Sequence, residues 1–298
     1  MHLRLSPASI LLLLCCLPVA AQPPSLKVLI SADMEGVAGV ISWKIDSQAA
    51  TRDYAQMRRV MTAEVNAAVA ASFEAGATEV TVADSHGDFA NLDPETLDPR
   101  CRLVRGWPRP LGMMEGLTAD TAAVVFIGYH APEGAANAMF AHTFTGSMDL
   151  RLNGKSVSEG SFNAAVAAEL HVPVVFLSGD DQAVVDALAN IGPIETVTTK
   201  KALGFSAGVM TAPATVAKSI HEGVARGIKR RAEFHPVAPG TPISLEWRFN
   251  NVTQAELVSY LPHATRKDGY TVRFTVGNMT EAYRLLTVVN VLASVSHE

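Results

Sequence analysis

Three apolar runs, each long enough for a buried strand, are followed directly by residues that can bind a metal ion. The run SLKVLISA precedes Asp33 and Glu35, TEVTVADS precedes His86, and AAVVFIGY precedes His130. Because the carboxyl ends of parallel strands meet in one crevice of an open α/β sheet, we expect these side chains to lie together. The sequence therefore predicts a metal site at that edge of the sheet.

Apolar segments alternate with segments of helical periodicity through the first half of the chain. Residues 51–75 carry apolar side chains at helical spacing and stop at Gly76, which is typical of a long amphipathic helix with a glycine end. The other predicted elements of this half are strands over 78–86, 122–130 and 172–181 and helices over 161–170 and 181–192. This order predicts an α/β fold with a mainly parallel sheet and helices on both faces.

The second half of the chain has weaker signals. A helix is predicted over 213–233, and the prolines and glycine between 236 and 242 mark a connection. The tail, 243–298, has the pattern strand, helix, strand, helix, which predicts a smaller C-terminal α+β lobe. The expected divisions are a signal peptide (1–21), a metal-binding catalytic α/β domain (22–240) and a C-terminal lobe (241–298).

The first 21 residues have the pattern of a secretory signal peptide. Arg4 precedes an apolar stretch from Ile10 to Cys16, and small residues precede a cleavage point after Ala21. An apolar stretch this short does not cross a bilayer, so a membrane anchor is the less favoured alternative and no stable membrane insertion is expected. The mature protein is predicted to be secreted or periplasmic.

Composition narrows the chemistry further. The formal net charge is −5, which provides no basic footprint for nucleic acid, and the basic run 229–231 is interpreted as a solvated helix end. Cleavage of the signal peptide would remove two of the three cysteines and leave Cys101 alone. No intrachain disulfide can then form, and any metal site has to rely on His, Asp and Glu.

Each strand-end candidate has a structural alternative. Asp33 and Glu35 lie two apart and face the same side of an extended chain, where two carboxylates repel unless a cation or proton lies between them; helix capping would need only one. His86 and His130 could each be structural turn histidines, but their shared place at strand ends favours metal ligation. Asp84 is predicted to orient the His86 ring.

Two further residues have weaker signals. His142 lies in a loop region, where catalytic residues are common. Glu159 lies in a polar turn and by default is interpreted as a surface carboxylate. The chain contains no G-x-S-x-G, P-loop, H-E-x-x-H or G-x-G-x-x-G motif, which argues against a serine hydrolase, a nucleotide-binding protein and a helical zinc peptidase.

Six fragments in a fixed order are specific in combination. They are SADMEGVAG, EVTVADSHGDFANL, MEGL, FIGYHA, LNGKSVSEGSFNA and VPVVFLSGDD. With them the chain closely resembles the zinc-dependent D-aminopeptidases of the DppA type, from about Val28 to the C-terminus. The resemblance also implies a homo-oligomer, in the form of a ring-shaped decamer whose active sites face an internal channel.

The same resemblance assigns roles to individual residues. It implies two zinc ions per chain, with Asp33 as the carboxylate shared between them. The implied ligand set is completed by Glu35, His86, His130 and Glu159. His142 is implied to be the catalytic histidine near the metals.

The function expected on these grounds is that of an exported dinuclear-zinc aminopeptidase. Its expected substrates are short peptides with an N-terminal D-amino acid, such as D-Ala-D-Ala. Two alternatives stay open, a non-catalytic envelope protein that binds metal or peptide, and a metal-dependent amidase that acts on non-peptide amides. His142 discriminates between catalysis and binding, because a pure binding protein needs no extra histidine beside the metal.

Overall fold

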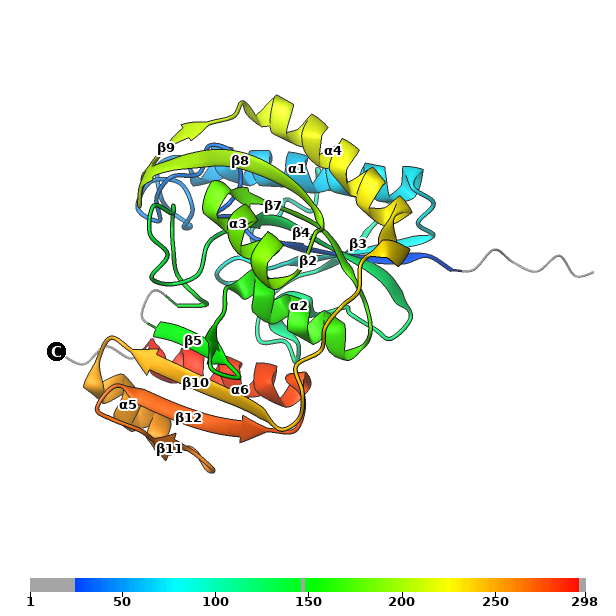
Figure 1. Ribbon diagram of the computed structural model, residues 1–298. Helices are drawn as coiled ribbons and strands as arrows, with labels where there is room; N and C mark the ends of the chain where they lie inside the picture. Colours follow the sequence, from blue (N-terminus) through cyan, green and yellow to red (C-terminus); the bar gives the residue numbers. More distant parts are fainter. Residues whose placement is uncertain (1–24, 146–147, 295–298) are drawn as a thin grey trace, which may run out of the picture.

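The computed structural model describes residues 25–145 and 148–294. Figure 1 shows a larger layered part that contains β1 to β4 and a smaller sheet beneath it. The predicted signal peptide and its cleavage point lie outside the described residues. Within the described ranges, no helix combines the length and the apolar character needed to cross a membrane.

Seven strands form the sheet of the larger part. They are β1 (Lys27–Ala32), β2 (Glu79–Asp84), β3 (Arg102–Val104), β4 (Thr121–Tyr129), β7 (Val174–Asp180), β8 (Glu195–Gly204) and β9 (Ala207–Met210). Their order is β3-β2-β1-β4-β7-β8-β9. All neighbours are parallel except β8 and β9, which form an antiparallel hairpin. The predicted mainly parallel sheet is confirmed.

Helices cover both faces of this sheet, as the sequence predicted. On one face α1 (Tyr54–Glu74) packs against α4 (Pro213–Lys229), and on the other lie α2 (Glu159–Glu169) and α3 (Asp181–Asn190) (Figure 1). A short 3-10 helix, η1 (Gly112–Met114), packs beside β1 and α2.

The core lies between the sheet and its helices. α1 buries Met57, Met61 and Val65, which follow one another at four-residue spacing and so share one face of the helix. β1 is buried from Val28 to Ala32 without alternation, which is the pattern of a parallel strand that is covered on both faces. The polar residues that follow such a strand are therefore carried into the interior.

A second, five-stranded antiparallel sheet lies in the smaller part, in the order β11-β12-β10-β5-β6. The strands of this sheet are β5 (Met148–Leu152), β6 (Lys155–Ser156), β10 (Ile243–Phe249), β11 (Thr265–Arg266) and β12 (Thr271–Val276). The smaller part also contains the helices α5 (Val252–Ser259) and α6 (Met279–Ala293). The strand, helix, strand, helix order predicted for the tail is present. β5 and β6 come from before residue 240, and the division of the chain at that residue stays a prediction.

The structure differs locally from the expected elements. The helix predicted over 213–233 ends at Lys229, and the 3-10 helix η2 (Arg231–Glu233) follows it. The strands β3, β8, β9 and β11 were not predicted. Glu159 lies not in a turn but at the first position of α2, where the Ser158 hydroxyl caps the helix by accepting from the Ser161 N–H.

Candidate metal centre

The predicted ligands converge at the carboxyl edge of the larger sheet. Asp33 and Glu35 follow β1, His86 follows β2, and His130 follows β4. Because β1 pairs with both β2 and β4, these three strand ends are adjacent. The loop after β4 adds His142, and α2 adds Glu159 at its first turn. All six side chains are buried, so the fold gathers three carboxylates and three imidazoles in its interior.

On the β1 side, the His86 ring faces two carboxylates. Its Nδ1 lies 2.8 Å from Glu35 Oε2 and 3.4 Å from Asp33 Oδ1. On the β4 side, His130 Nε2 lies 3.4 Å from Asp33 Oδ2 and 3.3 Å from Glu159 Oε1. The two oxygens of Asp33 therefore face two different histidines, which is the arrangement expected of a shared carboxylate.

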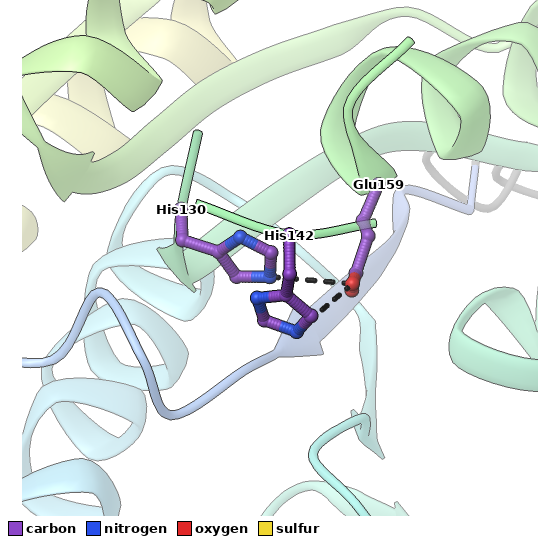
Figure 2. A group of neighbouring side chains, drawn as sticks. All are labelled: His130, His142 and Glu159. Atoms are coloured by element: carbon purple, nitrogen blue, oxygen red, sulfur yellow. Dashed lines mark ion pairs between the residues drawn. The ribbon is translucent and has the colours of Figure 1, made fainter. Parts of the chain in front are cut away.

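The third imidazole lies against the second. Figure 2 shows His130 and His142 side by side, both directed at the Glu159 carboxylate. Their ring centroids are 3.9 Å apart and their planes differ by 8°. His142 Nε2 is 3.5 Å from Glu159 Oε1 and 3.9 Å from Glu35 Oε1. His142 therefore lies against two of the predicted ligands, Glu35 and Glu159, and its catalytic role stays a prediction.

Each imidazole has its second nitrogen at a backbone carbonyl. His86 Nε2 lies 2.6 Å from the Ser47 oxygen, His130 Nδ1 lies 3.0 Å from the Ala131 oxygen, and His142 Nδ1 lies 2.6 Å from the Phe140 oxygen. Each carbonyl accepts a hydrogen bond from the N–H of the nearer ring nitrogen, which leaves the lone pair of the other nitrogen directed into the cluster. Histidines that bind metals in proteins are commonly oriented in this way.

Two atoms of the cluster fit a bound cation. Among the described residues, Asp33 Oδ2 and His130 Nε2 are both buried and have no hydrogen-bond partner. Buried polar atoms without partners are costly, and a divalent cation between them would satisfy both. Two groups of three residues each bring their ligand atoms within 4.8 Å of one another, and both groups include His130. The other members are His142 and Glu159 in one group, and Asp33 and Glu35 in the other. The nitrogen and oxygen donors are those of a zinc site without thiolates.

Comparison with known proteins identifies the family. The model of the D-aminopeptidase family matches residues 26–288. A D-aminopeptidase of Bacillus subtilis (strain 168) is 33% identical over 270 residues, which is 90% of this chain and 98% of the relative. The chain belongs to the D-aminopeptidase family. The resemblance seen in the sequence motifs is confirmed.

A solved structure of the family has the same fold. It is described as the Zn-dependent D-aminopeptidase DppA from Bacillus subtilis, a self-compartmentalizing protease. The TM-score is 0.87 at 32% identity, over 92% of this chain and 100% of that chain. The predicted α/β class and the prediction of a metallo-aminopeptidase are confirmed by these matches. The individual ligand assignments rest on the geometry described above.

Electrostatics in this D-aminopeptidase cluster favour bound protons when no cation compensates the carboxylates. Burial alone would lower the pKa of His130, but the negative charges of Glu159 and Asp33 outweigh burial and raise that pKa to about 10. The pKa of His86 is likewise raised well above its usual value, because Glu35 and Asp33 outweigh burial. Burial, together with the charge of Glu35, raises the pKa of Asp33. A cation that enters must therefore displace protons.

His142 differs from the other two histidines. Burial and the positive charge of His130 lower its pKa, so its ring is neutral near pH 7. With the proton on Nδ1, toward the Phe140 carbonyl, the lone pair on Nε2 lies in the cluster. This is the state required of a group that accepts a proton from a substrate or a water.

The support around the ligands was only partly predicted. Asp84 does not contact the His86 ring, and the expectation that it orients that ring is wrong. Its Oδ2 accepts from the N–H groups of Asn91 and Leu92 at 2.6 and 2.7 Å, and Asn91 Nδ2 donates to the His86 carbonyl. Asp84 therefore fixes the backbone of the loop that contains His86, because its carboxylate accepts hydrogen bonds from the other end of that loop.

Trp43 is a neighbour of the cluster that sequence reasoning missed. Its indole Nε1 donates to Glu35 Oε1 at 3.0 Å. Its ring also packs edge-on against His142, with centroids 5.2 Å apart. No sequence pattern marks it, since a tryptophan in a loop without periodicity gives no signal of what it contacts.

Proposed function

We propose that this protein is an exported zinc aminopeptidase that holds two zinc ions per chain and hydrolyses short peptides with an N-terminal D-residue, such as D-Ala-D-Ala. The observation that carries the proposal is the Asp33 carboxylate, whose Oδ1 faces His86 and whose Oδ2 faces His130. Among the described residues, Asp33 Oδ2 and the His130 Nε2 that it faces are buried without a hydrogen-bond partner. The zinc dependence stated for the DppA structure supports the metal. Family membership supports the D-configuration of the substrate.

The ligands divide naturally between two ions. Glu35 and His86 lie together on the β1 side and would hold one ion, whereas His130 and Glu159 would hold the other. Asp33 lies between the two pairs and would contact both ions. Five ligands with one shared carboxylate suit a two-metal site.

The chain's own residues supply the proton transfers. Bound zinc would supply a Lewis acid that polarises a peptide carbonyl and lowers the pKa of water from 15.7 toward about 7. His142 Nε2 would take a proton from the attacking water and give it to the leaving amine nitrogen. The Phe140 carbonyl holds the other nitrogen of the ring, and Trp43 packs against the ring edge. Both contacts keep His142 in one orientation.

The test of this function compares the two configurations of substrate. The chain from Gln22 is treated with a chelator, reloaded with zinc, and assayed on D-Ala-D-Ala, L-Ala-L-Ala and the two alanine amides. We expect zinc-dependent hydrolysis with preference for the D-dipeptide. Turnover of the amides alone would favour the amidase alternative. Zinc binding without any turnover would contradict the proposal and favour the binding protein.

Export and assembly are further parts of the proposal. Export is supported by the signal-peptide pattern of residues 1–21, and protein isolated from the host should begin at Gln22. A ring-shaped homo-oligomer is supported by the description of the DppA structure as self-compartmentalizing. Light scattering should give a mass several times that of one chain, and a monomer at micromolar concentration would contradict the ring.

A further inference from the structure

Two consecutive residues in the middle of β8, Thr199 and Lys200, are buried inside the larger sheet. Their exposed fractions are 0% and 1%. β8 is separated from β1 by β4 and β7, and Lys200 on β8 is in register with Asp180 on β7. A lysine is almost never fully buried unless its ammonium group has partners. The hydrogen-bond partners of the Lys200 ammonium group therefore indicate its role.

The three donors of the Lys200 ammonium meet three backbone carbonyls of one turn. Nζ donates to the carbonyl oxygens of Glu35, Val37 (3.1 Å) and Val40 (2.6 Å). The Thr199 hydroxyl lies 2.6 Å from the carbonyl oxygen between the first two, that of Gly36. Side chains of β8 thus hold four carbonyls of the turn that carries the predicted ligand Glu35.

This turn, residues 33–40, has no strand or helix of its own to fix it. Its remaining contacts come from distant elements as well. The Gly36 N–H donates to the Gly128 carbonyl at 2.7 Å, and the Ala38 N–H donates to Glu64 Oε1 at 2.9 Å. A side chain at Gly36 would collide with the Tyr129 carbonyl. The place of the Glu35 carboxylate therefore depends on the elements packed behind the turn.

The same ammonium also faces the segment that holds His142. Lys200 Nζ lies 5.4 Å from the centre of the Phe140 ring, within cation–π distance. The Phe140 carbonyl is the group that lies 2.6 Å from His142 Nδ1. One buried cation therefore contacts both the turn of a predicted ligand and the loop of the predicted proton carrier, without touching either functional side chain.

We propose that Thr199 and Lys200 are positioning residues, which set the place of the Glu35 carboxylate in the metal centre by holding the backbone of its turn. The inference rests on the proposed function, because it needs a metal at Glu35. A lysine is suited to this task since its three N–H donors match three buried carbonyls, which an apolar side chain would leave unpaired. Thr199 adds the fourth contact through a side chain that valine matches in shape.

Metal binding tests this proposal without relying on turnover. The full mature chain is compared as the parent, Lys200→Met, Thr199→Val and the control Gln254→Leu. Gln254 is also buried, and its Nε2 donates to the Ala293 carbonyl in the smaller part, away from the cluster. Each protein is stripped with a chelator and titrated with zinc against a chromophoric chelator. Co²⁺ is then added in place of zinc, because its visible absorption reports the coordination of the ion.

Lys200→Met should weaken zinc binding by about 10- to 100-fold, the usual cost of losing a group that orients a ligand. Thr199→Val should weaken it less, and both should change the Co²⁺ spectrum. In zinc-loaded protein, kcat should fall while KM changes little. Gln254→Leu should lower the melting temperature and leave zinc affinity and the Co²⁺ spectrum as in the parent.

The outcomes separate this proposal from the function on which it rests. Parental zinc affinity and Co²⁺ spectrum in folded Lys200→Met and Thr199→Val would overturn the positioning role alone. If Lys200→Met does not fold, Thr199→Val decides by itself, and parental values in it overturn the proposal. A parent that binds neither Co²⁺ nor zinc would overturn the proposed function, and the positioning role with it.

Discussion

The carboxyl edge of the larger sheet and the outer surface of the smaller sheet place charged residues in opposite environments. At the edge of the larger sheet, Asp33 and His130 are 2% and 3% exposed, and each has a buried atom without a hydrogen-bond partner among the described residues. In the smaller sheet, Glu246 on β10 lies 3.0 Å from both Lys267 and Arg273, whose side chains are exposed.

This difference in burial distinguishes charged residues that serve a binding site from those that form ion pairs at the surface. Burying a charge without a partner is strongly unfavourable, so a fold retains such a group where a ligand will pair with it. An ion pair at the surface contributes little to stability and is easily replaced. We therefore expect substitutions of charged residues at the carboxyl edge of the larger sheet to affect metal binding and catalysis. Substitutions of the surface pairs in the smaller sheet should affect only stability, and only weakly.

The largest expected effect is that of Asp33→Ala. Both oxygens of the carboxylate face histidines of the cluster, so the variant should lose both zinc ions and with them the activity. Elemental analysis of the purified protein measures this directly. Glu35→Ala is the matched comparison, and it should weaken chiefly one ion. An Asp33→Ala protein that retains parental zinc and turnover would remove the basis for treating this edge as a metal centre.

His142→Ala should follow, with a loss of turnover of about 100- to 10,000-fold, the usual contribution of a positioned general acid or base. Zinc content should stay at the parental value, because His142 is predicted to carry protons rather than to hold metal. Steady-state kinetics and elemental analysis on one preparation test both statements. Loss of zinc in this variant would make His142 a ligand, and unchanged turnover would make it structural.

A pH effect should appear when metal is removed. The pKa of His130 is raised to about 10, and that of His86 is raised as well, so both bind protons more tightly in the folded than in the unfolded chain. The stability they contribute is fully present below about pH 6.5 and is lost as the pH rises toward 10. The melting temperature of chelated protein should therefore fall over this range, while its affinity for zinc rises.

Zinc-loaded protein is the control for that measurement. Burial raises the pKa of Glu64 to about 8, which also removes stability as the pH rises, but this contribution is present in both preparations. The difference in melting temperature between loaded and chelated protein therefore reports on the groups of the cluster whose pKa is raised, which are His86, His130 and Asp33. A difference that stays constant from pH 7 to 10 would show that they are not protonated in the chelated protein.

The smallest effect is expected for Glu246→Ala in the second sheet. The pairs with Lys267 and Arg273 lie at the surface, so their loss should lower the free energy of unfolding by no more than about 1 kcal/mol. Urea unfolding measures this value, and kcat and zinc content should not change. A large loss of stability or any loss of zinc would erase the contrast between the two sheets.

The ends of β1, β2 and β4 could be predicted because they depend on residues that are close together in the sequence. A buried parallel strand needs a continuous apolar run, and the first polar residue after it marks the edge where sites form. Asp33 and His130 follow this rule directly, and His86 lies two residues beyond the end of β2. Glu159 gave no such signal, and only the family resemblance raised it above a surface carboxylate.

The support behind the site could not be predicted in this way. β8 has the sequence ETVTTKKALG, which contains no apolar run, and a lysine in it is expected at the surface. What buries Lys200 is the set of carbonyls offered by the turn 33–40, and a single sequence does not report contacts between segments so far apart. Trp43 escaped prediction for the same reason.

The distance along the chain between this turn and its support has a consequence for how the protein forms. Glu35 and Lys200 are 165 positions apart, so the turn leaves the ribosome long before the strand that holds it. Contacts of such long range form late in folding. We expect zinc to be bound at high affinity only in the last kinetic phase of refolding. Stopped-flow refolding with a zinc indicator measures this, and uptake in the first phase would contradict it. An exported chain built in this order would cross the membrane without a finished metal site.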